Sequence, residues 1–573
     1  MDATNLEVAR IFNEIADLLE IKQESTFRVN AYRRAARAVE SLSEDLRTIA
    51  QRGELRRIGG IGQSLAEKIE EYLRTGAIAY HEELRAAMPR GLAELMTIPE
   101  VGPKTALLLY ERLGVSSVAA LEEAARAGKV RQLPRMGAKT EQNILAGIAR
   151  MRAQSARQPL GAVLPHAQAI AGALRGISGV EALSIAGSIR RMRDTIADID
   201  IVVATRRSDA VMDAFVALPQ AETVLSKGST RSSIVLRHVG VQCDLRAVEP
   251  DSYGAALQYF TGSKDHNVQL RERAVRLGLR VSEYGVFRVR TDRRLAGRTE
   301  EDVYEALGLQ WIPPEIREAQ GELELAERRA LPALVRVGDI RGDLHVHTTW
   351  SDGAHTAEAM ARAARQRGYE YLCITDHSRS LKFAGGVTIE DLRAHARAVR
   401  HLSDRLGIRV LLGSEVDILP DGSLDYPDEV LESLDLVIGS IHSRFRMPRA
   451  ELTRRVIRAM ESPHLDILGH PTGRLVGQRE PLDLDIDAVV EAARRTETVL
   501  EINASPERLD LKDTHVRLAR DSGALFSIGT DAHRTEHFAY IDYGVGTARR
   551  GWVEATQVVN AWPLARLLDF LAR

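Results

Sequence analysis

Apolar residues recur at helical spacing throughout the first 150 residues of the chain. The N-terminal run shows the pattern, with apolar positions at Leu6, Ala9, Phe12, Ile15, Ala16 and Leu19. Breaks that contain glycine interrupt it at 59–62, 100–102 and 135–137, and another helical run follows each break. Because glycine permits tight turns between helices, we predict an all-α N-terminal part.

Short apolar strands alternate with helices from about residue 160, which predicts an α+β domain. Residues 255–310 combine a helix with basic, hairpin-like strands, and residues 313–330 are typical of an acidic helix or linker. From Asp343 onward, apolar strand-like runs and helical patterns repeat in turn. Repeated βα units favour a parallel sheet or a barrel.

These changes of pattern divide the chain. We expect segments at 1–90, 91–155, 156–255, 256–315, 316–338 and 339–573. The first two are helical, the third and fourth are mixed, the fifth is a linker and the last is an α/β barrel. A chain of 573 residues is long enough for such a multidomain organisation.

Charge is distributed unevenly along the chain, although the formal net charge is only −2. Residues 1–300 carry 44 Lys and Arg against 36 Asp and Glu, whereas the remainder carries 34 against 44. Twelve of the 16 histidines follow residue 340. We therefore expect a basic first part that binds nucleic acid and an acidic, histidine-rich second part that binds metal.

Other classes of protein fit the composition poorly. The two cysteines, Cys243 and Cys373, lie in apolar strand-like runs, so we interpret both as reduced core residues. The N-terminal residues lack the pattern of a signal peptide, and no apolar run approaches 18 residues. We expect a cytoplasmic, nucleoid-associated monomer with no membrane partner.

The three glycine breaks are candidate DNA-binding turns. A tight turn before a helix presents backbone N–H groups that can bind a phosphate without reading bases. The breaks resemble helix–hairpin–helix motifs, with candidate DNA contacts at Gly60, Gly62, Gly102, Lys104, Gly137 and Lys139. The alternative is that the breaks are ordinary αα-turns that bind no ligand. The presence of three copies favours the DNA-binding interpretation. The basic run around Arg28 and Tyr32 suits a strand backbone or an end phosphate.

Acidic residues in a strand-like run provide the first catalytic candidates. Asp198 and Asp200 stand two apart, so both carboxylates point to the same side of a strand. Such a pair is costly unless a divalent cation bridges it, and Mg²⁺ prefers carboxylates together with substrate phosphates. Gly187 and Ser188 upstream open a short helix that could hold phosphate, and Asp244 follows on a later strand. The pattern predicts a two-metal site for phosphoryl transfer; the alternative is an exposed strand edge with unrelated acids.

This arrangement resembles the nucleotidyltransferase signature of the family X DNA polymerases, the family of DNA polymerase beta, and the match continues through residues 257–271. The resemblance implies a palm at 156–255, a nucleotide- and template-binding subdomain at 256–315, Mg²⁺ or Mn²⁺ as cofactor, and dNTPs and gapped or nicked DNA as partners. It implies catalytic, metal-binding roles for Asp198, Asp200 and Asp244. Nucleotide contacts are implied for Gly187, Ser188, Arg191, Tyr259, Phe260, Gly262, Asn267 and Arg271. Met192 and Ala197 stand where the family has glycine, which puts the grip on the triphosphate in question.

The resemblance extends to the first helical domain, where Lys68 occupies the position of a lysine that attacks abasic-site aldehydes. Arg28 and Tyr32 match residues of the 5′-phosphate pocket. Schiff-base chemistry needs a neutral amine, which neighbouring cations favour. Ser64 replaces one such family lysine, so an ordinary surface lysine is an equal alternative.

Histidines and acids gather at the ends of the strand-like runs in the last segment. His345 and His347 share one face of a strand, and further His, Asp or Glu residues end the later runs. The C-terminal ends of barrel strands are where active sites collect. This pattern resembles the polymerase and histidinol phosphatase (PHP) family, a distorted (β/α)7 barrel that holds up to three ions of manganese, zinc or iron. The ligands implied are His345, His347, Asp352, His377, Glu415, His442, His470, Asp531 and His533.

Two further residues of the last segment have expected roles beside the ligands. We expect Asp376 to orient an adjacent imidazole, and Arg444 to receive a substrate phosphate or to be an exposed loop residue.

Together the resemblances imply a bacterial family X DNA polymerase that fills short gaps in base excision repair. Its PHP domain would act as a 3′–5′ exonuclease or process abasic sites and 3′ ends. One alternative is a PHP phosphatase for small phosphomonoesters with a non-catalytic DNA-binding front half. Another is a non-catalytic scaffold that holds DNA ends.

Overall fold

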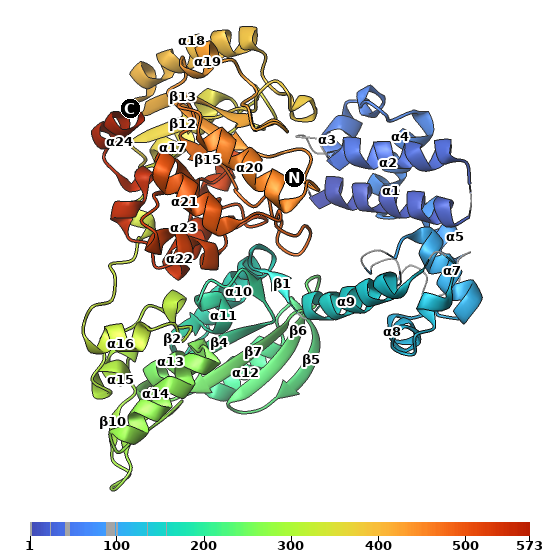
Figure 1. Ribbon diagram of the computed structural model, residues 1–573. Coiled ribbons are helices and arrows are strands. Elements are labelled where there is room, and N and C mark those ends of the chain that lie inside the picture. The colour runs from blue at the N-terminus through green and yellow to red at the C-terminus, as the bar shows by residue number, and fades with distance from the viewer. Residues whose placement is uncertain are drawn as a thin grey trace. The chain divides into compact units, whose positions relative to one another are not determined.

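The computed structural model describes residues 3–22, 24–40, 46–86, 95, 98, 101–134, 136–155 and 157–572 (Figure 1). The chain forms two units, Met1–Ala156 and Arg157–Arg573. Each unit has its own hydrophobic cores.

The first unit is helical throughout its described residues, as the sequence predicts. Its first half consists of α1 (Ala3–Ile21), α2 (Thr26–Glu40), α3 (Leu46–Gln51), α4 (Gln63–Thr75) and α5 (Ala79–Ala86). These helices bury their apolar faces around Phe12, Ile15 and Ile69. Its second half consists of α7 (Pro103–Leu113), α8 (Val118–Arg126) and α9 (Ala138–Ser155), with Leu109 and Leu121 in a separate core.

The second unit begins with a five-stranded mixed sheet in the order β2-β4-β7-β6-β5. Its strands are β2 (Val180–Ile185), β4 (Asp198–Thr205), β5 (Ala221–Lys227), β6 (Arg231–Leu236) and β7 (Gln242–Val248), and a small pair, β1 (Gln158–Pro159) and β3 (Thr195–Ile196), lies beside it. Helices α10 (Leu160–Arg175) and α12 (Ser208–Val216) cover one face of the sheet, where Ile199, Ile201 and Val203 of β4 are buried. Alternation along β4 therefore turns Asp198 and Asp200 toward the opposite face.

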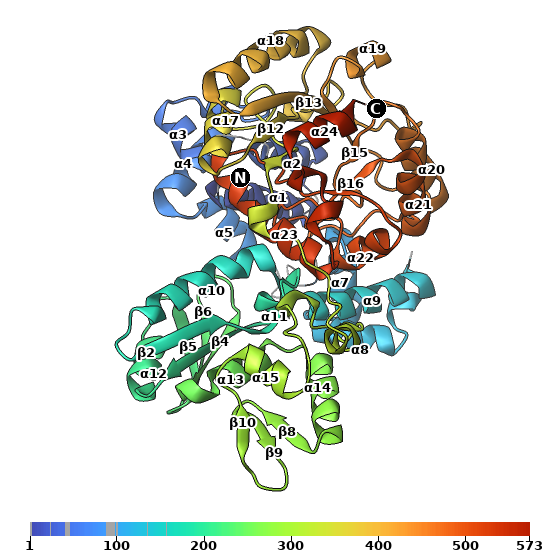
Figure 2. The same cartoon turned by 90° about the vertical axis from the view of Figure 1, so that its left-hand side faces the viewer.

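That opposite face is covered by α13 (Tyr253–Thr261), which begins the next subdomain. The subdomain continues with α14 (Lys264–Arg276), the antiparallel strands β8 (Leu279–Ser282), β9 (Gly285–Arg288) and β10 (Arg294–Ala296), and α15 (Glu300–Ala306) (Figure 2). Residues 316–338, expected as a linker, contain α16 (Glu322–Glu327). Ile316 and Ala326 of this segment are buried in the same core as Tyr304, so the segment packs into the subdomain.

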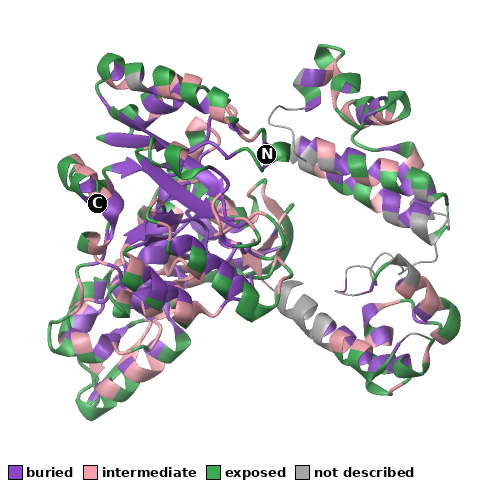
Figure 3. Cartoon of the chain, turned by 45° about the horizontal axis from the view of Figure 1, so that its top comes forward, coloured by how far each residue is buried: buried purple, intermediate pink, exposed green. Residues whose placement is uncertain are grey.

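The last part of the chain is a seven-stranded parallel sheet whose strands follow chain order. The strands are β11 (Gly342–Asp343), β12 (Tyr371–Ile374), β13 (Arg409–Asp417), β14 (Leu436–Ser440), β15 (Ile467–Leu468), β16 (Val499–Glu501) and β17 (Phe526–Ser527). The helices between and after them are α17 (Ala357–Gln366), α18 (Ile389–Leu406), α19 (Asp428–Leu431), α20 (Arg449–Met460), α21 (Ile486–Thr496), α22 (Asp513–Asp521), α23 (Ile541–Arg550) and α24 (Leu564–Leu571). A parallel bridge between Val346 and Ala532 joins the extensions of β11 and β17. The predicted α/β barrel is confirmed, and its strands are almost wholly buried (Figure 3).

Two further expectations concern the cysteines and membrane-spanning helices. Cys243 and Cys373 are free and buried, as predicted. None of the helices that the structure describes has the length and apolar character needed to span a bilayer.

Candidate active sites

The three candidate aspartates of the palm lie on two neighbouring parallel strands. Asp200 of β4 is the direct register partner of Asp244 of β7, and Asp198 lies two residues before it. Burial, together with the nearby carboxylates of Asp198 and Asp244, raises the pKa of Asp200 to about 7. Gln242 Nε2 donates to Asp244 at 2.9 Å. A divalent cation relieves the repulsion that neighbouring carboxylates exert on such a buried carboxyl group.

Gly187 brings the chain against these carboxylates. Its φ is +60°, and a Cβ built on it would lie 2.3 Å from Asp200 Oδ2. Ala186 N, just before it, donates to the Asp200 carbonyl at 2.8 Å. A side chain at position 187 would therefore clash with a candidate metal ligand, which explains the glycine.

A cavity of about 570 Å³ opens beside the aspartates. It is lined by Arg157, Gly187, Ser188, Arg191, Arg193, Asp198, Asp200, Tyr259, Phe260, Gly262, Ser263, Lys264, Asp265, Asn267, Arg271 and Glu318. The structure thus brings all eight candidate nucleotide contacts into one cavity with two of the three candidate aspartates. The basic side chains in this wall suit an anionic, phosphate-bearing ligand.

The cavity wall is held by contacts among its own residues. Asn267 Nδ2 donates to the Tyr259 carbonyl at 2.8 Å, and Gln258 Nε2 donates to Asn267 Oδ1 at 2.8 Å. The rings of Tyr259 and Phe260 pack edge to face, with 5.2 Å between their centroids. These contacts fix the segment whose residues the family resemblance implies as nucleotide contacts.

A buried ion cluster supports the same wall from behind. Glu300 pairs with Arg190 at 2.7 Å and with the fully buried Arg317 at 2.7 Å. Burial opposes ionisation of Glu300, but Arg317 and Arg190 hold its pKa at about 2. Arg190 Nη1 also donates to Thr261 Oγ1 at 2.7 Å, which links α11 (Gly187–Arg190) to the end of α13.

The two departures from the family glycines have different geometries. Met192 has a φ of +53°, so it keeps a backbone conformation that favours glycine, whereas Ala197 has a negative φ. The Met192 side chain packs against Gly546 of α23, where an added Cβ would lie 2.5 Å from Met192 Cε. A methionine at position 192 therefore contacts the barrel, which a glycine could not do.

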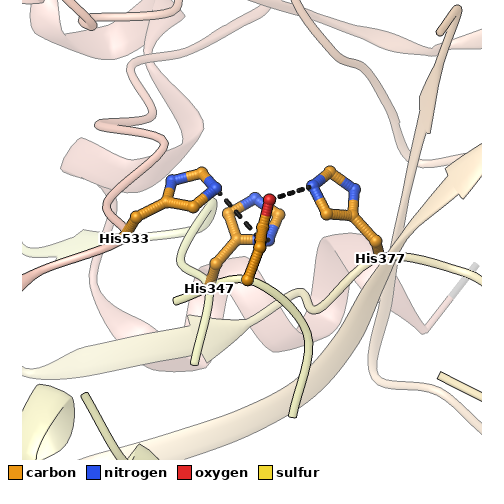
Figure 4. A group of neighbouring side chains, drawn as sticks. His347, His377 and His533 are labelled. Atoms are coloured by element: carbon orange, nitrogen blue, oxygen red, sulfur yellow. Dashed lines mark ion pairs between the residues drawn. The ribbon is translucent and has the colours of Figure 1, made fainter. Parts of the chain in front are cut away.

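The second site lies inside the barrel, where three groups of ligand atoms share residues. The groups are His347, Asp352, His377 and His533; His345, His347 and Asp531; and His377, Glu415 and His442. Within each group the ligand atoms lie within 4.8 Å of one another. In the first group, the Asp352 carboxylate lies 3.2 Å from His533 Nε2 and 3.5 Å from His377 Nε2, among the three imidazoles (Figure 4). Shared residues make the groups one continuous cluster.

His470 is the only one of the nine candidates outside these groups, and it lies beside them. Its Nε2 is 2.8 Å from Glu415 Oε1. Burial opposes ionisation of Glu415, but His377, His442 and His345 hold its pKa well below the usual range. The structure therefore gathers all nine sequence candidates at one end of the barrel strands.

The cluster has the donors that a metal needs. Several buried imidazole nitrogens lack a hydrogen-bond partner among the described residues, including both nitrogens of His347, Nε2 of His345 and Nδ1 of His470. Unpaired polar atoms in a protein interior are costly unless something binds them. Imidazole and carboxylate donors suit Zn²⁺, Mn²⁺ and iron, so the residues fit the expected metals.

Two acidic residues beside the cluster were not among the candidates from the sequence. Glu501, at the end of β16, accepts from His345 Nδ1 at 2.6 Å and from the His470 backbone N at 2.6 Å. Asp417, at the end of β13, lies 2.6 Å from His442 Nδ1. Such partners fix the tautomer and direction of a ligating imidazole. Each acid ends an apolar strand-like run, the same feature that drew attention to the histidines and acids of this segment.

The expected role of Asp376 is wrong in detail. Its carboxylate accepts from Thr348 N at 2.7 Å and from Ser351 Oγ at 2.6 Å, so it holds the loop after His347. The imidazole near it is His395, at 3.7 Å, which is not a ligand candidate. Arg444 is an exposed loop residue.

The three glycine breaks of the first unit share one geometry. An apolar residue closes each turn by donating its N–H to the carbonyl three residues earlier, in the pairs Ile61 to Ile58, Val101 to Ile98 and Met136 to Leu133. A glycine follows each closing residue, and α4, α7 and α9 begin directly after it. Gly62, Gly102 and Gly137 are exposed, as is Lys139, so the helix N-termini face solvent; the Lys104 side chain lies outside the described residues.

The candidate lyase residues meet around a tyrosine that the sequence did not single out. Lys68 Nζ lies 5.1 Å above the ring of Tyr80, and Arg28 Nη2 donates to the Tyr80 hydroxyl at 3.0 Å. The ring of Tyr32 stacks on Tyr80 at 6.4 Å. Gly60 lies beside α2, since a Cβ built on it would lie 3.9 Å from Arg34 Cβ. The three candidates, on α2 and α4, therefore meet at Tyr80 of α5, although Tyr32 itself is buried in the helical core.

The fold and the two sites define a class: a nucleotidyltransferase palm joined to a metal-binding phosphoesterase barrel. Family models match in the same order along the chain: a helix-hairpin-helix domain at 3–78, a SAM-like helix-hairpin-helix tandem at 92–150, a DNA polymerase beta thumb at 256–318 and a PHP domain at 343–505. A Bacillus subtilis protein named DNA polymerase/3'-5' exonuclease PolX is 39% identical over 569 residues, which cover 99% of each chain. The chain belongs to this family, the bacterial family X DNA polymerases with a C-terminal PHP domain.

Shorter relatives match a smaller part of the chain. A protein of Syntrophotalea carbinolica named probable phosphatase is 32% identical over 241 residues, which are 40% of this chain and 95% of that protein. A probable phosphatase of Shewanella sediminis is 28% identical over 242 residues. The helix-hairpin-helix and thumb matches imply that this chain binds DNA. The names of these shorter relatives do not mention DNA.

Proposed function

We propose that the protein is a DNA-directed DNA polymerase that fills short gaps in base excision repair and carries a 3′–5′ exonuclease in its PHP domain. The observation that carries the proposal is the single cavity that joins Asp198 and Asp200 to all eight candidate nucleotide contacts. A full-length relative with both activities in its name supports it. The DNA substrate is a gapped or nicked duplex, and dNTPs are the second substrate.

In the polymerase site, Asp198, Asp200 and Asp244 would hold Mg²⁺ or Mn²⁺. Asp244 is the candidate general base or ligand for the primer 3′-hydroxyl. Ser188 and Arg191 bind the triphosphate, since both line the cavity next to the aspartates.

The remaining cavity residues select the nucleotide. Tyr259 and Phe260 flank the sugar and help to exclude ribonucleotides; their edge-to-face packing fixes the two rings against each other. Asn267 and Arg271 contact the incoming base and the template. Because Gln258 and the Tyr259 carbonyl hold the Asn267 amide, its orientation is set before the nucleotide arrives.

In the barrel, the nine clustered ligands bind up to three ions of manganese, zinc or iron. Divalent ions bound at either site stabilise charge on the phosphoryl group, and in the barrel they also lower the pKa of a bound water. Glu501 and Asp417 orient His345 and His442 through Nδ1, which leaves the other ring nitrogen directed into the cluster. The chain's own contribution is thus a fixed set of nitrogen and oxygen donors around the 3′ end of DNA.

The first unit holds the DNA. The exposed turns before α4, α7 and α9 bind strand backbones, with Gly60, Gly62, Gly102, Lys104, Gly137 and Lys139 as contacts. Arg28 and Tyr32 bind a 5′-phosphate at the gap, and Lys68 is the candidate nucleophile for abasic-site lyase chemistry. We place the protein in the cytoplasm with the nucleoid, as a monomer.

A small-molecule phosphatase is the second candidate, because a protein named probable phosphatase matches 40% of this chain over 95% of its own length. One comparison separates the two functions: nucleotide incorporation on a one-nucleotide gap, nucleotide release from a 3′ end, and hydrolysis of p-nitrophenyl phosphate, all at equal enzyme concentration. The proposal expects the two DNA reactions to dominate by kcat/KM. Faster hydrolysis of the phosphomonoester, with no incorporation, would establish the phosphatase instead.

A further inference from the structure

One arginine of the nucleotide cavity is tied to the PHP barrel. Arg191 lines the cavity, and its Nε donates to Glu318 Oε1 at 3.1 Å. The same carboxylate oxygen accepts from Arg550 Nη1, at the end of α23, at 2.9 Å. Arg550 Nη1 also donates to the backbone carbonyl of Arg191 at 2.7 Å. Arg550 of the barrel therefore contacts the main chain of Arg191 directly. It also reaches the Arg191 guanidinium indirectly, through Glu318.

Both ends of this chain of contacts are anchored. Arg550 Nε donates to Asp513 Oδ2 of α22 at 2.8 Å, and the side chain of Arg550 is 5% exposed. On the other side, Glu322 accepts from the backbone N–H groups of Ala319 and Gln320 at 2.8 and 2.6 Å, which fixes the segment that carries Glu318. An anchored, largely buried ion network restricts the rotamers of the residues in it.

The surrounding interface is packed as well. Met192, the residue after Arg191, lies against Gly546 one turn earlier on α23. Nearby, Asp194 pairs with Arg474 of the barrel at 3.0 Å. The loop that follows α11 is therefore held by the barrel at three successive points, at positions 191, 192 and 194.

We propose that Arg550 of the PHP domain is a positioning residue for the polymerase reaction: through Glu318 and the Arg191 carbonyl it sets the direction in which Arg191 meets the triphosphate of the incoming nucleotide. The inference rests on the proposed polymerase activity and deepens it. A guanidinium gives specific contacts to phosphate only when its planar donors are correctly directed. The barrel thus contributes to nucleotide binding at a site that its own ligands do not reach.

The neighbouring residue provides a matched control. Arg549 crosses the same interface from the same helix turn, pairing with both oxygens of Glu315 at 2.8 and 3.1 Å and donating to the Val335 carbonyl at 3.0 Å. It has no contact with Arg191. Arg549→Met removes the same charge and a comparable ion pair, so it reports any general loosening of the interface.

The test measures dNTP KM and kcat on a one-nucleotide gap for the full-length wild type, Arg550→Met and Arg549→Met. The Kd of a nonhydrolysable dNTP analogue is measured in parallel, because KM alone mixes binding and chemistry. Misdirecting one charge-assisted contact raises KM and Kd about tenfold in Arg550→Met, with kcat changed less than about threefold. Arg550→Lys keeps the charge but cannot reach Glu318, Asp513 and the Arg191 carbonyl together, so its KM lies in between.

Each outcome has a separate meaning. Equal increases in KM for Arg549→Met and Arg550→Met would overturn the proposal, since they would show interface loosening. Unchanged KM and Kd in Arg550→Met would also overturn it. If Arg550→Met does not fold, wild-type KM in Arg550→Lys overturns it in the same way. A wild type that incorporates no nucleotide would instead refute the proposed polymerase function, whereas release of nucleotides from 3′ ends by all variants shows that the barrel is intact.

Discussion

Replacing Glu501 by glutamine tests the architecture of the metal cluster without touching a ligand. Glu501 is 1% exposed and holds two of the nine candidates, through His345 Nδ1 and the His470 backbone N–H. The backbone N–H can only donate, so the glutamine oxygen must stay on that side. The glutamine NH2 group then faces His345 Nδ1.

This exchange reverses the tautomer of His345. An NH2 group facing Nδ1 requires that nitrogen to accept, which places the ring proton on Nε2. Nε2 lies 3.4 Å from Glu415 and is the nitrogen directed into the cluster, so His345 can no longer bind a metal through it. Loss of such an orienting partner lowers metal affinity about 10- to 100-fold, or about 1.4 to 2.7 kcal/mol.

The assay is metal content and Mn²⁺ or Zn²⁺ affinity of the purified full-length protein, followed by nucleotide release from a 3′ end. Glu491→Gln is the matched control, because Glu491 carries the same charge on α21 and pairs with the exposed Arg494. The reasoning fails if Glu501→Gln binds metal within about twofold of the wild type while folding normally. It also fails if Glu491→Gln loses as much affinity.

Two further predictions concern the polymerase half. Glu300→Gln leaves Arg190 and the buried Arg317 without their counter-charge, so unfolding by denaturant at pH 7 should cost about 3–5 kcal/mol less. Because the pKa of Glu300 is depressed to about 2, this difference should shrink as pH falls from 4.5 toward 2; an equal difference at pH 7 and pH 3 would contradict the assignment. Gly187→Ala places a methyl group 2.3 Å from Asp200 Oδ2 and should reduce incorporation at least about tenfold, with exonuclease rates unchanged. Wild-type incorporation in that variant would show that residue 187 does not shape the site.

Local pattern predicted part of each site. Period-2 alternation placed Asp198 and Asp200 on one face, and the ends of the apolar runs indicated where the histidines of the last segment gather, whereas the full set of nine barrel ligands came from the resemblance to the PHP family. The same pattern does not show which acid pairs with which imidazole. That pairing depends on strand register, which is why Glu501 and Asp417 were missed although both end apolar runs.

Contacts between distant parts of the chain were beyond the sequence. Tyr80 meets Lys68 and Arg28 only because α2, α4 and α5 pack together. Two acids of residues 316–338 do not face solvent: Glu318 pairs with Arg191, and Glu322 pairs with His266. In the sequence, a segment whose charged residues form buried ion pairs cannot be distinguished from a solvated linker with the same residues.

The central claim is that one chain holds two separate active sites, and one labelled substrate tests it most directly. A one-nucleotide gap with a labelled primer is given to wild type, Asp198→Ala/Asp200→Ala and His345→Ala/Asp531→Ala, with dNTPs and Mg²⁺ or Mn²⁺. The account predicts that the first double variant shortens the primer without extending it, and that the second extends without shortening. Extension by Asp198→Ala/Asp200→Ala, or shortening by His345→Ala/Asp531→Ala, would contradict it.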